Sequence, residues 1–216
     1  SLVRGQVSIA NSHFTAARIE AVYPWAASRL RVIPRGCDEQ ALAPENFSAA
    51  DKAAKRAAWG VGDSDFVIIC PARVTHLKGQ HVLIAALGLL ASDKKPKLVL
   101  VGSAQGRDDY VAALKNQAAA LGYGDRLVMT GLETDMASAY AAADLAIVPT
   151  IRPEPFGRTI IEAQAAGLPV IGSDAGGYRE TIIAQSPANG GTGWRSRINN
   201  AEALAAAIEA ALAMSP

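Results

Sequence analysis

Two basic and two acidic residues have the types and spacing needed to bind a phosphorylated sugar derivative. Arg73 and Lys78 lie in one loop, and two cations so close together can pair with the oxygens of a diphosphate. Glu154 and Glu162 are separated by seven residues and flank the start of a predicted helix. Because carboxylates repel phosphate, each glutamate is better suited to accept hydrogen bonds from sugar or ribose hydroxyls. The simpler alternatives, loop-rim charges and helix-start charges, remain open at this point.

The elements that must position these residues are short apolar strands that alternate with helices. Seven runs predict strands: residues 7–10, 30–33, 66–70, 97–101, 126–130, 144–148 and 169–172. They are mostly apolar, as in parallel strands that are buried on both faces. From residue 66 onward the pattern therefore predicts an α/β domain with a doubly wound, Rossmann-like parallel sheet.

The expected strand order brings the four residues to one place. In the common order 3-2-1-4-5-6, the sheet reverses direction between the strands at 66–70 and 144–148, and ligands bind in the crevice at that point. Loop 71–79 leaves the first of these strands and loop 149–157 leaves the other. A helix that begins near Gly157 would point its unpaired amides into the same crevice. We therefore expect a diphosphate site there.

The chain divides into three parts. We interpret residues 1–35 as the tail of a preceding N-terminal domain, 36–65 as a linker with a leading helix, and 66–216 as the ligand-binding domain. Ser48 and Asp51 have the spacing of a capping box at the start of the leading helix. The abrupt start at Ser1 suggests a fragment.

Composition excludes several classes of protein. With 21 basic and 20 acidic residues among 216, the chain offers no continuous basic surface for nucleic acid. Its apolar runs are too short to span a membrane. Cys37 and Cys70 have no spacing typical of a metal site, and a signal peptide is lacking, so we expect a cytoplasmic protein with idle thiols.

The segment 154–177 resembles the signature of the retaining GT-B glycosyltransferases of the glycogen-synthase-like group, glycosyltransferase family 4. Residues 32–38 resemble the interdomain connection of that family, and residues 72–79 resemble its phosphate-binding loop. The amino-acid sequence of residues 153–158 and 162–164 is similar to that of lipopolysaccharide-core mannosyltransferases. The chain would then be the C-terminal, donor-binding half of a GT-B fold.

The resemblance implies a role for each candidate residue. Glu154 would contact the transferred sugar as the catalytic residue, and Glu162 would accept hydrogen bonds from the ribose. Arg73 and Lys78 would hold the donor diphosphate. The remaining assignments concern mainly backbone atoms: Gly131 and Leu132 near the base, and Phe156, Gly157 and Arg158 near the sugar and phosphates.

The resemblance also implies an activity and its partners. A hexose, with mannose favoured, would pass with retention from a GDP- or UDP-sugar to a glycan or glycolipid acceptor such as lipopolysaccharide core. The leaving group would be stabilised by cations and amides, with no metal and no cofactor. The missing N-terminal domain would bring the acceptor, so this chain alone should be inactive. The full-length protein would be cytoplasmic, peripheral at the inner face of the membrane.

Two other functions remain open. A nucleotide-sugar epimerase of related fold would also need a diphosphate grip and paired carboxylates. A non-catalytic nucleotide-binding module is the other alternative, although residues 102–106 lack the GxGxxG spacing of a dinucleotide site.

Three further features have simple structural interpretations. We interpret Asp63 and Asp65 as a turn and Glu180 as a helix N-terminal carboxylate. The Gly176–Gly177 pair is either a close backbone approach or an ordinary turn.

Overall fold

A six-stranded parallel sheet organises most of the molecule. The computed structural model describes residues 3–91, 95–185 and 190–214. The strands are β3 (Val67–Pro71), β4 (Lys97–Val101), β5 (Leu127–Gly131), β6 (Leu145–Val148), β7 (Val170–Ser173) and β8 (Gly193–Ser196). They are hydrogen-bonded in the order β5-β4-β3-β6-β7-β8. The predicted fold class and strand order are confirmed, with the reversal of direction between β3 and β6.

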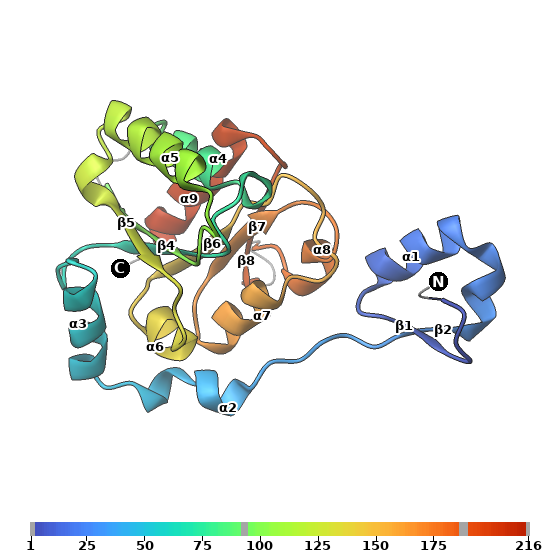
Figure 1. Cartoon of the computed structure of the whole chain (residues 1–216). Helices are drawn as coiled ribbons and strands as arrows, with labels where there is room; N and C mark the ends of the chain where they lie inside the picture. The colour runs from blue at the N-terminus through green and yellow to red at the C-terminus, as the bar shows by residue number, and fades with distance from the viewer. Residues whose placement is uncertain (1–2, 92–94, 186–189, 215–216) are drawn as a thin grey trace.

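Helices cover both faces of this sheet (Figure 1). One face packs against α4 (Gln80–Leu87), α5 (Asp108–Ala120) and α9 (Ala201–Met214), and the other against α3 (Ala49–Ala58), α6 (Met136–Ala141), α7 (Arg158–Ala165) and α8 (Tyr178–Thr181). Along β3, Ile68 and Cys70 enter the first core while Val67 and Ile69 enter the second. This alternation explains why central strands such as β3 carry apolar residues at consecutive positions.

All seven predicted strands occur, with their ends shifted by at most one residue. The sequence prediction missed β8, which pairs with β7 in parallel at the edge of the sheet. Its four residues read Gly-Trp-Arg-Ser and form no apolar run. An edge strand needs fewer apolar side chains than a central one, so hydrophobicity gave no signal.

Residues before the linker form a small unit of their own. Strands β1 (Ser8–Ala10) and β2 (Leu30–Val32) pair in parallel, and α1 (His13–Val22) and the 3-10 helix η1 (Pro24–Arg29) connect them. Figure 1 shows an extended segment leading from this unit to α2 (Glu39–Leu42). Three further 3-10 helices are η2 (Pro44–Asn46), η3 (His76–Lys78) and η4 (Gly124–Arg126).

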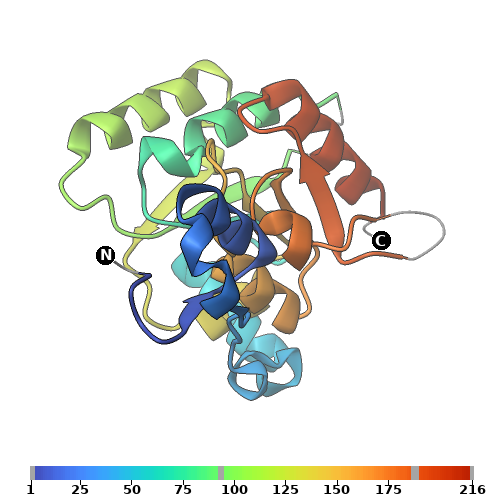
Figure 2. The same ribbon diagram turned by 90° about the vertical axis from the view of Figure 1, so that its right-hand side faces the viewer.

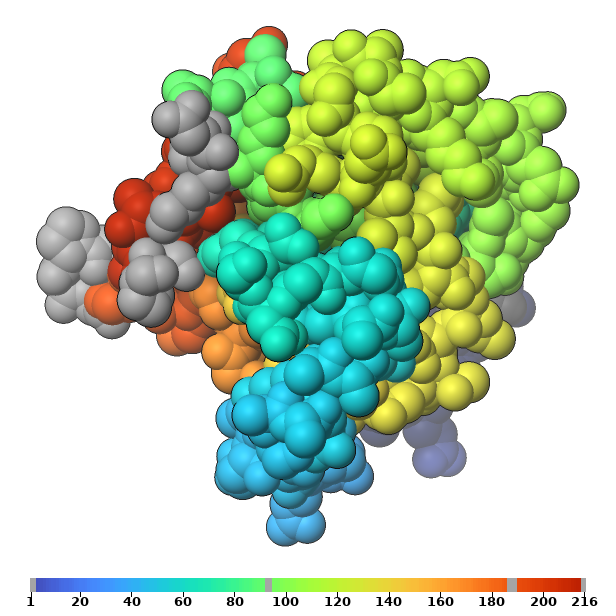
Figure 3. Space-filling model, turned by 90° about the vertical axis from the view of Figure 1, so that its left-hand side faces the viewer, coloured from blue at the N-terminus to red at the C-terminus, as the bar shows by residue number. Residues whose placement is uncertain are grey.

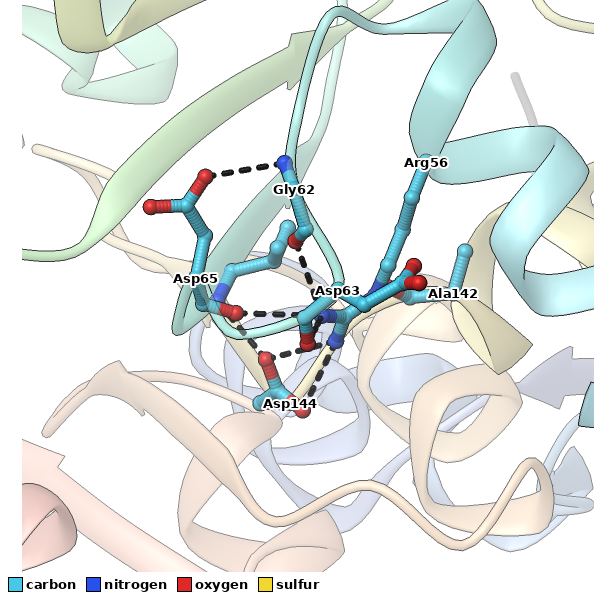
Figure 4. A network of polar contacts seen from close by, with 7 residues as sticks. Arg56, Gly62, Asp63, Asp65, Ala142 and Asp144 are labelled. Atoms are coloured by element: carbon cyan, nitrogen blue, oxygen red, sulfur yellow. Dashed lines mark hydrogen bonds and ion pairs between the residues drawn. The ribbon is translucent and has the colours of Figure 1, made fainter.

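The leading helix α3 is fastened to the start of the sheet by Arg56 (Figure 4). Ser48 and Asp51 form the predicted capping box at its N-terminus. The Arg56 guanidinium donates two hydrogen bonds to Asp144, at 2.9 and 3.0 Å, and others to the carbonyls of Ala142, Asp63 and Asp65.

This network confirms that residues 63–65 form a turn. Figure 3 shows the segment of α3 against the segment that carries α6, and the two helices are in contact. Among the described residues, none of the helices is both long and apolar enough to span a membrane.

Candidate functional site

The loops that leave β3 and β6 meet at the carboxyl edge of the sheet, as predicted. Gly79 has a φ of 74°, and a Cβ at this position would lie 1.9 Å from the carbonyl oxygen of Pro149. The Ile151 amide donates to the Leu77 carbonyl at 3.1 Å, which joins the two loops directly. Only a glycine permits this approach, so Gly79 positions one loop against the other.

The meeting of these loops brings Lys78 and Glu154 into an ion pair. The Lys78 ammonium donates to the Glu154 carboxylate, and the two side chains are 22% and 24% exposed. Both groups are thus mostly withdrawn from water while still accessible at the surface. The pair places a cation and a carboxylate, the two kinds of group that the sequence prediction assigned to phosphate and to sugar hydroxyls, at one point.

Gly176 and Gly177, which follow β7, support Glu154 from the other side. The Gly177 amide donates to the Glu154 carbonyl at 2.8 Å, and a Cβ on Gly176 would lie 2.3 Å from the same oxygen. A Cβ on Gly177 would lie 2.5 Å from Cα of Phe156. Of the two interpretations left open for this pair, close backbone approach is confirmed. The approach is to the loop that carries Glu154.

Glu162 projects from the second turn of α7 and has two polar neighbours. The Arg158 guanidinium donates to one carboxylate oxygen at 2.8 Å, and the Tyr140 hydroxyl lies 3.4 Å from the other. Burial raises the pKa of Tyr140, and the negative charge of Glu162 raises it further, so this hydroxyl stays protonated and can only donate to the carboxylate. Tyr140 therefore orients Glu162, a role that the sequence did not reveal.

Helix α7 begins at the expected place. Gly157 precedes it with a φ of 95°, and this N-cap residue has no side chain to satisfy the first amides of the helix. A Cβ on Gly157 would collide with the Tyr178 ring at 2.1 Å. Phe156 is buried beside it, only 7% exposed. The start of α7 can thus offer amides to an anion at the edge that also carries Glu154.

Arg73 lies on the same loop as Lys78, but its exposed side chain lines a different hollow. This hollow, of about 790 Å³, is also lined by Thr75, His76, Arg107 and Tyr110. Among the described residues, no recorded hydrogen bond joins the Arg73 guanidinium to the Lys78–Glu154 pair. The structure therefore brings together Lys78 and Glu154 directly, and Arg73 through its loop alone.

Leu132 directly follows the last residue of strand β5. It is 77% exposed and follows Gly131, whose φ is 74°, just beyond the end of β5. The Gly131 carbonyl accepts a hydrogen bond from the Gly102 amide at 2.8 Å. The exposed apolar side chain of Leu132 could therefore pack against a flat ring, as the sequence prediction for a base requires.

One of two stacked histidines, His76, lines the hollow beside Arg73. The rings of His76 and His81 stack with centroids 4.3 Å apart, and the His81 Nδ1 lies 3.1 Å from the Tyr110 hydroxyl. Burial lowers the pKa of His81, and His76 lowers it further. A neutral His81 suits this stack, because two protonated rings would repel each other.

A second hollow lies at the opposite edge of the sheet. It is lined by residues at or near the starts of strands, among them Phe66, Asp144 and Pro169. None of the site residues predicted from the sequence lines it, although Tyr140 does. In a sheet of this kind ligands bind at the carboxyl ends of the strands, so we place the functional site at the Lys78–Glu154 edge.

Glu180 makes a contact that the sequence interpretation did not foresee. It lies in the first turn of α8, as expected of a helix N-terminal carboxylate. Its two oxygens, however, accept hydrogen bonds from the amides of His13 and Phe14 at 2.8 and 2.7 Å. These residues lie more than 160 positions earlier in the chain, so no local sequence pattern could have indicated the contact.

Comparisons with known proteins agree on one family. The family model described as "Glycosyl transferases group 1" matches residues 51–216. The D-inositol 3-phosphate glycosyltransferase of Segniliparus rotundus is 32% identical over 180 residues, which cover 82% of this chain and 39% of the relative. The lipopolysaccharide core biosynthesis mannosyltransferase LpsB of Rhizobium meliloti is 30% identical over 161 residues, covering 74% of this chain and 44% of that protein.

The fold has a close counterpart among solved structures. The Anabaena protein Alr3699/HepE, in complex with UDP-glucose, superposes with a TM-score of 0.82 at 31% identity, covering 97% of this chain and 55% of that one. This chain therefore spans less than half the length of the two curated relatives and about half of the solved structure.

Proposed function

Because this chain belongs to the group 1 glycosyl transferases, we propose that it is the donor-binding half of an enzyme that transfers a hexose from a nucleoside-diphosphate sugar. The acceptor is a glycan or a glycolipid. The observation that carries this proposal is the Lys78–Glu154 pair at the reversal point of the sheet. It supplies a cation for the diphosphate and a carboxylate for the sugar in direct contact.

The diphosphate binds through Lys78, Arg73 and the first amides of α7. Lys78 is paired with Glu154 in the structure, so a bound phosphate takes the place of the carboxylate as its partner. The amides at the start of α7 have no side-chain cap and carry the positive end of the helix dipole. Charge that develops on the departing nucleoside diphosphate is then stabilised by groups already in place.

The two glutamates have different tasks. Glu154, released from Lys78, accepts hydrogen bonds from hydroxyls of the transferred sugar, and its negative charge stabilises positive charge that develops at the anomeric carbon. Glu162 is oriented by Tyr140 and Arg158 and accepts from the ribose hydroxyls. Leu132 and Gly131 lie against the base, while Phe156, Gly157 and Arg158 surround the sugar and phosphates. No metal ion takes part, and transfer retains the anomeric configuration.

Two relatives narrow the donor and the acceptor. UDP-glucose is bound by Alr3699/HepE, which supports a nucleoside-diphosphate hexose as donor. LpsB is named a mannosyltransferase of lipopolysaccharide core biosynthesis, which supports mannose and a glycolipid acceptor. We propose a GDP- or UDP-hexose donor, with mannose favoured, and an enzyme that works in the cytoplasm at the inner face of the membrane.

The acceptor site belongs to a domain that precedes the linker. We propose that residues 1–35 are the end of that domain, 36–65 the connection and 66–216 the donor domain. In support, Ile9 on β1 is 64% exposed and Ile33 beyond β2 is 54% exposed, as expected for a small sheet whose face packs against further parts of a larger domain. This chain alone therefore binds nucleotide and does not transfer sugar.

Kinetics of the full-length enzyme test the assignment of the two glutamates. Glu154→Ala should lower turnover more than it weakens donor binding, whereas Glu162→Ala should weaken binding of the nucleotide itself. The reverse pattern would exchange their roles. Product analysis by NMR should show a glycoside with the anomeric configuration of the donor, and an epimerised nucleotide sugar would instead support the epimerase alternative.

A further inference from the structure

The first turn of α1 is held by a carboxylate from the other end of the chain. A helix begins with amides that have no partner within the helix. In α1 these are His13, Phe14 and Thr15. The Ser12 hydroxyl accepts from the Thr15 amide at 3.0 Å, and Glu180 accepts from the other two at 2.8 and 2.7 Å. Glu180 on α8 therefore completes the cap of a helix in the N-terminal unit.

The same turn of α1 also grips the loop that carries Glu154. The Ser12 hydroxyl donates to the Pro155 carbonyl, and the Thr15 hydroxyl lies 3.3 Å from the same oxygen. Ser12 is only 1% exposed, so the hydroxyl side of this contact is shielded from water, whereas Pro155 itself is exposed. Figure 2 shows α1 in front of the segment that carries α8. Pro155 directly follows Glu154, so the N-terminal unit holds the backbone next to the candidate catalytic carboxylate.

The loop is thus fixed between two supports. On one side Gly177 donates to the Glu154 carbonyl, and on the other Ser12 donates to the Pro155 carbonyl. The first support belongs to the large sheet domain and the second to the small N-terminal unit. Only the second support would change if the N-terminal unit moved relative to the sheet domain.

We propose that Glu180 and Ser12 are positioning residues that form a latch between the N-terminal unit and the Glu154 loop. With the latch closed, Glu154 sits where it meets Lys78. With the latch open, the amides of His13 and Phe14 lose Glu180 as their acceptor, and the loop loses the hydrogen bond from Ser12. The proposal rests on the proposed function for the significance of Glu154, but the contact itself does not depend on that function.

Hydrogen exchange on the whole 216-residue chain tests the latch. In Glu180→Ala the amides of His13 and Phe14 should exchange roughly fivefold to tenfold faster, the factor that corresponds to the loss of a helix cap. Glu180→Gln keeps one acceptor oxygen and should restore part of the protection. The matched control is Glu20→Ala, which removes an exposed carboxylate from α1, the helix that carries His13 and Phe14.

Positioning requires a second readout, the side-chain carboxyl ¹³C signal of Glu154. It should shift in Glu180→Ala and in Ser12→Ala, move back toward wild type in Glu180→Gln, and stay unchanged in the control. Unchanged exchange at His13 and Phe14 in Glu180→Ala would overturn the latch. Faster exchange with an unmoved Glu154 signal would overturn the positioning role.

These readouts are taken without nucleotide and therefore stand apart from the proposed function. If the chain bound no nucleoside diphosphate while the exchange and carboxyl signals behaved as expected, the proposed function would fail and the latch would stand. If the chain bound nucleotide and the exchange and carboxyl signals did not change in the variants, the proposed function would stand and the latch would fail.

Discussion

Replacement of Glu154 by glutamine should tighten the binding of a nucleoside diphosphate. In the structure the Glu154 carboxylate occupies the Lys78 ammonium, the cation that we assign to the diphosphate. A ligand that binds Lys78 must first displace this carboxylate. Glu154→Gln removes the competing charge and keeps the size of the side chain, so a ligand can bind Lys78 without first breaking an ion pair.

The size of the effect follows from the burial of the pair. At 22% and 24% exposure the two side chains lie near the surface, where an ion pair contributes about 1 kcal/mol at most. Glu154→Gln should therefore lower the Kd by up to about fivefold. Lys78→Ala loses a charged hydrogen bond to phosphate, about 1.5–3 kcal/mol, but no longer has an ion pair to break. Its net effect should be a loss of about 0.5–2 kcal/mol.

Calorimetric titration of the four members of the double-mutant cycle measures this coupling. Glu154→Gln should have a smaller effect when Lys78 is already alanine, because the competition for the ammonium is gone. Glu45→Gln, which changes an exposed carboxylate in η2, is the control and should leave the Kd unchanged. Weaker binding in Glu154→Gln would refute the reasoning, since it would mean that the carboxylate contributes to nucleotide binding.

Three further predictions concern other parts of the molecule. Arg73→Ala should weaken nucleoside diphosphate binding by about 1.5 kcal/mol, and an unchanged Kd in calorimetry would remove Arg73 from the site. Arg56→Ala removes the bidentate contact with Asp144 together with three hydrogen bonds to backbone carbonyls, and the sum of these losses should lower the free energy of unfolding in urea by about 3 kcal/mol. A loss below about 1 kcal/mol would contradict the role of this network. Because the pKa of His81 lies below its ordinary value of 6.5, the unfolded chain binds more protons, so stability should fall as pH drops below 6.5. Urea unfolding of His81→Gln should show less of this loss, and an equal loss would exclude His81 as its source.

The central sheet could be predicted from the sequence because its inner strands are apolar and therefore stand out as short hydrophobic runs. Strand β3 is buried at all five positions and therefore carries an uninterrupted apolar run. Edge strand β8 could not be found in this way, since Trp194 and Arg195 are only partly buried and its neighbours are small or polar. The strand order follows from the common topology of such sheets, and this order by itself predicts that the loops of Lys78 and Glu154 meet.

The sequence could not predict the partners of the site residues. Tyr140 orients Glu162 from another helix, and a buried tyrosine looks like any core residue in the sequence. Glu180 is correctly placed at a helix start, yet its carboxylate serves α1. Such contacts depend on how distant segments pack, and one sequence without its relatives carries no signal for them. The roles of the site residues toward a donor stay predictions.

The most direct test of the central claim is calorimetric titration of this chain with UDP, GDP and ADP, with NAD as a control and without added metal. We expect one nucleoside diphosphate to bind, and to bind more weakly to Lys78→Ala. Binding of NAD alone, or nucleotide binding that is indifferent to Lys78, would contradict the assignment of a sugar-nucleotide site to the edge where Lys78 meets Glu154.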